Sequence, residues 1–131
     1  MAATMFRMIL QVGDLDRAMD LYSKLLETGG RKVGGGRAYF DCGAMILALV
    51  QAEGDPTPLP ENVYFAVAEL EAFHARAKEL DMLSADEVHG ESAGEIIERP
   101  WGERSFYARD PWGNGLCLVD EQTIFTGRRA P

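Results

Sequence analysis

The sequence predicts an α+β fold made of two tandem βαβββ modules, because a strand, a helix and a hairpin recur in the same order along its 131 residues. The clearest hairpin is residues 104–120, where an aromatic-rich run and an apolar run flank a turn at residues 110–114 that contains proline, glycine and asparagine. Residues 37–50 repeat this hairpin around a shorter turn. The strand and helix before each hairpin also recur, since Val12 falls on Val67 at an offset of 55 residues.

The two hairpins align at slightly larger offsets than the strands that precede them. Arg37 falls on Arg104 at an offset of 67 residues, and Leu47 falls on Leu116 at an offset of 69. The second module is therefore longer by about a dozen residues, and we assign this insert to residues 82–95.

The chain is expected to form one domain over residues 1–131. Three of the six prolines lie in a stretch with no periodicity that separates the modules. The expected parts are a first module at about residues 5–51, a linker at 52–61, a second module at about 62–121 and a tail at 122–131.

The first module begins with an apolar strand at residues 6–12. Asp14 is a plausible N-cap for a helix that continues to about Glu27, because apolar residues then recur at helical spacing. The three glycines at 34–36 predict a turn, since neither a phosphate-loop motif nor a helix follows them. The other strands are expected at residues 31–33, 37–42 and 44–51.

The second module repeats this order with additions from its insert. A strand is expected at residues 62–67 and a helix at about 69–80. His74 lies off the apolar stripe of that helix and His89 lies in the polar insert, so both histidines are expected to face solvent. The other strands are expected as a short edge strand near residue 87, at residues 95–99, and in the hairpin 104–120.

Composition restricts the partners and the compartment. The net charge of −8, from 21 acidic and 13 basic residues, argues against a nucleic-acid partner, because phosphate binding needs a basic face. No apolar run reaches the roughly 18 residues of a membrane helix and no signal-peptide pattern is present, so we expect a cytoplasmic protein without a membrane partner. Cys42 and Cys117 are then expected as reduced thiols.

The sequence resembles the vicinal oxygen chelate superfamily, which includes glyoxalase I, extradiol dioxygenases, fosfomycin-modifying enzymes and bleomycin-resistance proteins. The carriers of this resemblance are the run V-x-D-L-D-R-A at 12–18, the opening of the second module at 62–70, Trp101-Gly102 followed by Phe106, and the turn 110–114. The resemblance covers roughly residues 5–121. It implies a curved, incomplete barrel with the helices outside, often assembled as a homodimer.

The resemblance also implies where metal ligands would stand in a metal-dependent member. Such members carry His or Glu on the first and last strands of each module, and the repeat locates those positions at Arg7, Ala48, Asn62 and Cys117. Alanine offers no donor atom, arginine is permanently charged, and asparagine is a weak neutral ligand. We therefore expect neither a metal nor another cofactor.

Candidate ligand-binding residues follow from strand alternation and from aromatic content. Arg7 shares one strand face with Ile9 and Gln11, so it anchors a ligand carboxylate or carbonyl if that face lines the concavity, or forms a structural ion pair. Four strand aromatics either fill the core or line a pocket as a group: Tyr39, Tyr64, Phe106 and Tyr107. The candidate set is Arg7, Tyr39, Asn62, Tyr64, Trp101, Phe106, Trp112 and Cys117, with no catalytic residue among them.

Three function classes remain open from the sequence. The leading one is a metal-free, homodimeric binding protein of the bleomycin-resistance type, which sequesters a small aromatic or cationic ligand in acidic concavities. The second is a metal-dependent lyase, isomerase or dioxygenase with ligands at other positions. The third is a structural or regulatory dimer with a vestigial pocket.

Overall fold

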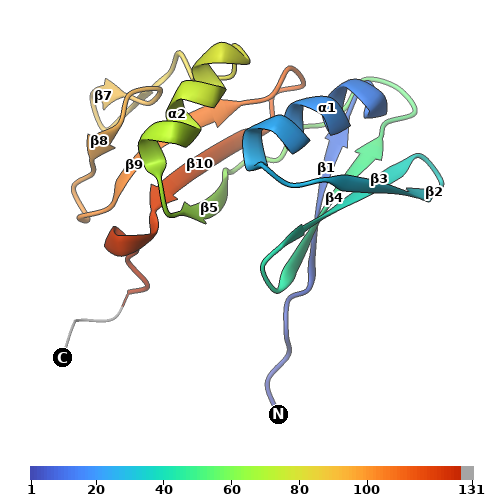
Figure 1. Ribbon diagram of the computed structural model, residues 1–131, viewed down its shortest axis with the longest axis horizontal. Coiled ribbons are helices and arrows are strands. Elements are labelled where there is room, and N and C mark those ends of the chain that lie inside the picture. Colours follow the sequence, from blue (N-terminus) through green and yellow to red (C-terminus); the bar gives the residue numbers. More distant parts are fainter. Residues whose placement is uncertain (128–131) are drawn as a thin grey trace. The chain divides into compact units, whose positions relative to one another are not determined.

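The computed structural model describes residues 1–127, and the chain divides into two compact units, Met1–Leu59 and Pro60–Pro131. The division falls within the stretch expected as a linker. Each unit is one mixed four-stranded sheet with a helix against one face, which confirms the predicted α+β class and the two βαβββ modules (Figure 1). Residues 128–131 of the predicted tail lie outside the described part of the chain.

Unit 1 follows the predicted order closely. Its sheet has the order β1-β4-β3-β2, in which β1 runs parallel to β4 and the other neighbours are antiparallel. The Asp14 carboxylate accepts a hydrogen bond from the Arg17 backbone N–H at 3.1 Å, so the predicted N-cap is confirmed. The elements are β1 (Arg7–Val12), α1 (Leu15–Leu26), β2 (Gly30–Gly34), β3 (Arg37–Cys42) and β4 (Met45–Gln51).

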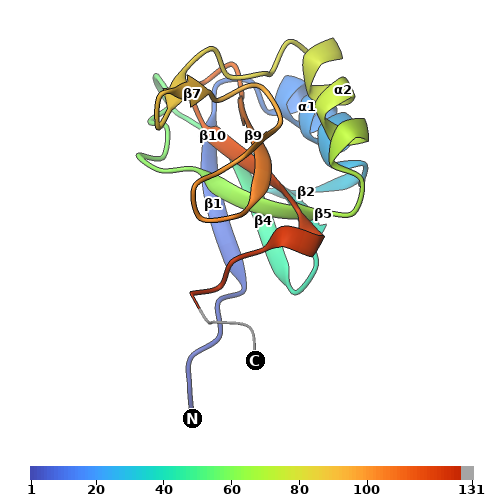
Figure 2. The same ribbon diagram turned by 90° about the vertical axis from the view of Figure 1, so that its left-hand side faces the viewer.

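Unit 2 has the same topology with an added excursion. Its main sheet has the order β5-β10-β9-β8 and again pairs its first and last strands in parallel. Figure 2 shows α2 on one side of β9 and β10 and the insert with β7 on the other. The elements are β5 (Val63–Val67), α2 (Leu70–Glu79), β6 (Glu87–Val88), β7 (Glu91–Ser92), β8 (Ile97–Glu98), β9 (Arg104–Arg109), β10 (Gly115–Asp120) and a short 3₁₀ helix η1 (Glu121–Thr123).

The insert differs from its prediction. The strand expected at an edge near residue 87 pairs instead with β7, which makes a separate two-stranded hairpin. The strand expected at 95–99 contains only two residues in β8, because the Arg99 N–H bonds to the Glu103 carbonyl and turns the chain. Among residues 1–127, no helix combines the length and the apolar character that crossing a bilayer requires.

Each sheet has a helix face, covered by its helix, and a far face on the other side. In unit 1 the helix face contains the buried side chains of Leu10, Phe40 and Leu49, and Phe40 packs against Tyr22 of α1. In unit 2 the helix face contains Phe106, whose ring meets His74 of α2 edge-on with centroids 5.0 Å apart. The two faces decide which side chains are available to a ligand.

Candidate functional site

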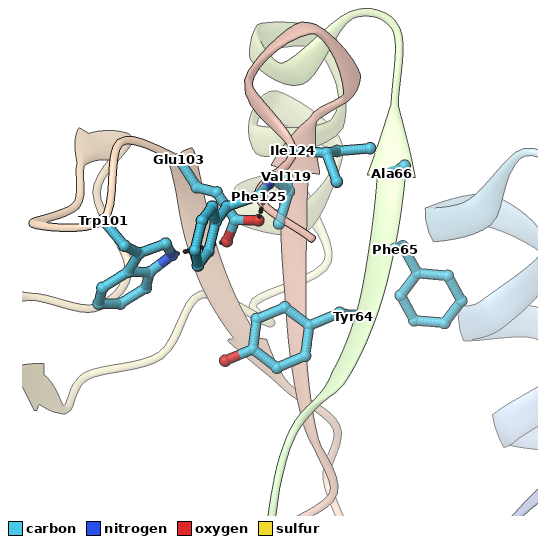
Figure 3. A pocket seen from close by; sticks show the side chains of 8 residues that line it. All are labelled: Tyr64, Phe65, Ala66, Trp101, Glu103, Val119, Ile124 and Phe125. Carbon is cyan, nitrogen blue, oxygen red and sulfur yellow. Dashed lines mark hydrogen bonds between the residues drawn. The ribbon is translucent and has the colours of Figure 1, made fainter. Parts of the chain in front are cut away.

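The far face of unit 2 carries a pocket of about 380 Å³, within the roughly 300–1,000 Å³ typical of small-molecule sites. Three elements build it: strands β5 and β10, the segment that leads into β9, and the chain that follows η1. The lining residues are Tyr64, Phe65, Ala66, Trp101, Glu103, Val119, Ile124 and Phe125 (Figure 3). The Phe65 ring points to the other side of β5, away from Tyr64.

Glu103 organises one wall of the pocket. Its side chain accepts a hydrogen bond from Trp101 Nε1 at 2.7 Å and another from the Phe125 backbone N–H at 2.8 Å. One carboxylate therefore fixes two aromatic residues that are far apart in the sequence, and Figure 3 shows both on the same side of β5 as Tyr64. Glu103 is only 8% exposed, and within residues 1–127 no cationic side chain pairs with it.

A buried arginine supports the other side of this face. Arg99 is 3% exposed and donates to Ser105 Oγ at 3.1 Å and to the carbonyls of Ser92, Ala93 and Glu95. Its guanidinium also lies 5.1 Å from the centre of the Tyr107 ring. Arg99 therefore attaches the insert to β9 with its donors directed at carbonyls, so its charge is not the partner of Glu103.

Tyr107 and Cys117 lie in the covered part of the same face. Cys117 pairs with both Tyr64 and Tyr107 in the sheet register, and it packs with Ala93 and Val119 in a small buried cluster. Burial raises the pKa of the Cys117 thiol to about 11. Burial likewise raises the pKa of the Tyr107 phenol, and a hydrogen bond with Tyr64 adds to that shift. Both groups are thus protonated near neutral pH.

The register corrects one residue in the repeat alignment. Tyr39 pairs with Ala48 in unit 1, and Tyr107 pairs with the equivalent Cys117 in unit 2, so the true offset between Tyr39 and Tyr107 is 68 residues. The offset of 67 predicted from sequence instead placed Phe106 opposite Tyr39. Because neighbouring residues of a strand point to opposite faces, that slip put Phe106 on the ligand side, whereas it lies fully buried under α2.

The other sequence candidates divide between the two units. Tyr64 and Trp101 line the pocket, while Trp112 is half-buried in the turn between β9 and β10 and is not among the pocket residues. Asn62 precedes β5, and its Oδ1 occupies the space that a Cβ at Gly115 would need. Sequence reasoning missed Glu103, Ile124 and Phe125, although the Trp-Gly-Glu run at 101–103 was a signal for the first.

Arg7 and Tyr39 lie together on the far face of unit 1. Arg7, Ile9 and Gln11 are exposed whereas Leu10 and Val12 are buried, which confirms the predicted alternation. Arg7 Nη1 donates to the Tyr39 hydroxyl at 3.1 Å. The acidic concavity expected from the net charge is therefore wrong for this face, which carries arginines.

The two histidines also differ from each other. His74 was expected to face solvent, but it is half-buried and its Nε2 donates to the Gly94 carbonyl at 2.9 Å. That contact connects α2 to the insert. His89 is exposed as predicted, and its ring contacts Trp101 edge-on with centroids 5.3 Å apart.

The donor set at the four family positions fits a metal poorly. Ala48 is fully buried and has no donor, and Arg7 brings a fixed positive charge. Cys117 would have to lose a proton whose pKa burial has raised to about 11. Within residues 1–127, no three His, Cys, Asp or Glu side chains are grouped as a metal site.

Comparisons with known proteins agree with this architecture. The family described as the Glyoxalase/Bleomycin resistance protein/Dioxygenase superfamily matches residues 4–118. A glyoxalase/bleomycin resistance protein from Albidiferax ferrireducens T118 superimposes with a TM-score of 0.71 at 20% identity, over 87% of this chain and 95% of that one. The curated proteins that were compared gave no significant match.

Two other solved structures with enzyme names share the fold. Oxidase ChaP-H2 has a TM-score of 0.70 at 20% identity, covering 92% of this chain and 94% of its own. Lactoylglutathione lyase from Agrobacterium tumefaciens has a TM-score of 0.62 at 21% identity, covering 95% of this chain and 98% of its own. At these identities the likeness concerns the fold alone. The family match spans most of the sequence, and the chain belongs to the Glyoxalase/Bleomycin resistance protein/Dioxygenase superfamily.

Proposed function

We propose that this protein is a metal-free, homodimeric binding protein of the bleomycin-resistance type, which holds a small aromatic or cationic ligand in the pocket of unit 2. Binding alone is the mechanism, since sequestration lowers the concentration of the unbound ligand. The observation that carries the proposal is the Glu103 carboxylate, buried beside three aromatic side chains with no cationic partner in the described residues.

The physical reason is that a buried charge is costly unless it is compensated. Two N–H donors from Trp101 and Phe125 stabilise the Glu103 carboxylate, but neither donor cancels its charge. A ligand cation would do so, and the faces of Trp101, Tyr64 and Phe125 provide aromatic area for stacking and for cation–π contact. Planar aromatic cations are therefore the best-matched ligands.

Charge neutralisation of Glu103 tests this proposal. We expect Glu103→Gln to weaken binding of proflavine, a planar aromatic cation, by at least about tenfold, because charge-assisted contacts typically exceed 1.4 kcal/mol. Binding is followed by fluorescence anisotropy of the dye. Binding of 2-naphthol, a neutral ring probe, should change much less.

The matched control is Glu79→Gln, which removes the same charge from an exposed position on α2. Equal weakening of proflavine binding by both substitutions would mean that the net charge of the chain attracts the dye. The pocket would then not be its site.

The enzyme alternative is kept because solved relatives of this fold include proteins named as an oxidase and a lyase. It requires a metal held by residues other than the four equivalent positions. Stoichiometric metal in the native protein, together with loss of activity on chelation, would favour this alternative.

A further inference from the structure

The far face of unit 1 concentrates arginine in a protein that is acidic overall. The sheet register and alternation place three arginines and one aspartate there, although the whole chain carries a net charge of −8. The charged and aromatic members of this arginine face are Arg7, Arg31, Arg37, Tyr39 and Asp41. No acidic side chain of α1 reaches it, because the helix covers the opposite face.

Tyr39 is the centre of the arginine face. Arg7 donates to its hydroxyl at 3.1 Å, and the guanidinium carbon of Arg7 lies 5.6 Å from the centre of the Tyr39 ring. Arg31 stands opposite Tyr39 in the register, with its guanidinium 6.0 Å from the same ring. Arg37 and Asp41 lie two residues to either side of Tyr39 along β3, so all four charged side chains surround one phenol.

The charges of this face are only partly balanced. Asp41 accepts both Arg31 nitrogens, at 3.0 and 3.2 Å, which accounts for the one carboxylate. Arg7 has a neutral hydroxyl as its hydrogen-bond partner, and within residues 1–127 Arg37 has no carboxylate partner. Two guanidinium groups therefore keep donors for a further acceptor, because arginine carries five N–H donors.

We propose that the arginine face is a binding site for the oxyanion group, carboxylate or phosphate, of a small ligand. Guanidinium groups match such planar or tetrahedral oxyanions with paired hydrogen bonds, and Tyr39 supplies a ring surface between them. Arg7 and Arg37 are the charged anchors, and Arg31 is the lesser contributor because Asp41 already occupies it. This inference does not depend on the pocket of unit 2.

The test uses the full-length protein and three probes: benzoate, phenyl phosphate and inorganic phosphate. Calorimetric titration gives the affinity, and backbone amide shifts in nuclear magnetic resonance spectra locate the site. We expect saturable binding with shifts on β3 around Tyr39, and roughly tenfold weaker binding for Arg7→Gln and for Arg37→Gln. Binding should also weaken as ionic strength rises.

Lys32→Gln is the matched control, because Lys32 lies on the helix face of the same sheet in an ion pair with Asp16. It removes the same charge and should leave the affinity unchanged, as should Glu103→Gln in unit 2. Benzoate binding alone would identify a carboxylate, and binding of the phosphate probes alone would identify a phosphate. Absence of saturable binding by all three probes, or equal weakening by Lys32→Gln, would overturn the proposal.

Discussion

Cys117 is the residue where the family pattern and the local environment conflict most clearly. It occupies a position where metal-dependent relatives carry a ligand, yet its side chain is fully buried and its pKa is raised to about 11 by that burial. Cys42, the other cysteine, is half-buried, and burial raises the pKa of its thiol too. Both are thiols as predicted, and Cys117 acts as a small core residue.

The raised pKa of Cys117 predicts a loss of stability at alkaline pH. Above the ordinary thiol pKa of 9.0 the unfolded chain releases this proton, while the folded chain retains it up to about 11. The folded state then binds more protons, so its stability falls as pH rises through this interval. We expect Cys117→Ala to flatten that fall by up to roughly 2–3 kcal/mol, measured by urea unfolding at a series of pH values.

Cys42→Ala is the control, since its thiol is only half-buried and should contribute a smaller slope. An unchanged slope in Cys117→Ala would show that Tyr107, whose phenol pKa is also raised by burial, dominates the alkaline response instead.

At the scale of elements, the first turn of each helix shows how the repeat has diverged. Asp14 and Glu69 stand at equivalent positions before α1 and α2. The Asp14 side chain caps its helix by accepting from the Arg17 N–H, whereas Glu69 makes no side-chain cap bond. The longer glutamate side chain is poorly placed for this bond, which accounts for the difference.

The two caps predict unequal costs of truncation. Asp14→Ala should lower the free energy of unfolding by about 1 kcal/mol, because it removes a hydrogen bond to an otherwise unsatisfied N–H. Glu69→Ala is the matched control and should cost less. Thermal unfolding of both variants measures the difference. Equal losses would indicate that the charge in the first turn matters more than the cap bond.

Strand register is the element-scale feature that sequence patterns predicted least well. Both hairpins, both helices and the parallel first strands follow from periodicity and turn residues, since these signals are local. The face of Phe106 did not, because Phe106 and Tyr107 are both aromatic and one residue of slip exchanges them. Hydrogen-bond register depends on the partner strand, and hydropathy along one strand does not encode it.

A double-mutant cycle tests the corrected register. Phe106→Leu and His74→Ala should be coupled by about 0.5–1.5 kcal/mol, because the two rings meet edge-on between β9 and α2. The control pair Tyr107→Phe and His74→Ala should be additive within about 0.5 kcal/mol, since Tyr107 lies on the other face. Urea unfolding of the six proteins gives both values. Coupling only in the control pair would restore the alignment expected from sequence.

At the scale of the whole molecule, the net charge of −8 is a poor guide to the sites. The arginine face of unit 1 and the buried Glu103 of unit 2 have opposite charge characters within one acidic chain. The sequence therefore located several site residues, such as Arg7, Tyr64 and Trp101, but not the sign of their surroundings. Glu103 was missed because its role depends on Phe125, which lies beyond η1 and has no repeat counterpart.

The central claim is that this chain binds its ligand without a metal. The most direct measurement combines metal analysis of the native protein with tryptophan-fluorescence titration by bleomycin, with and without a chelator, in a Trp112→Phe background so that Trp101 alone reports. We expect far less than one metal per chain and saturable quenching that chelation leaves unchanged. Stoichiometric metal, or quenching that disappears with the chelator and returns with added divalent ions, would contradict the account and favour a metal-dependent enzyme.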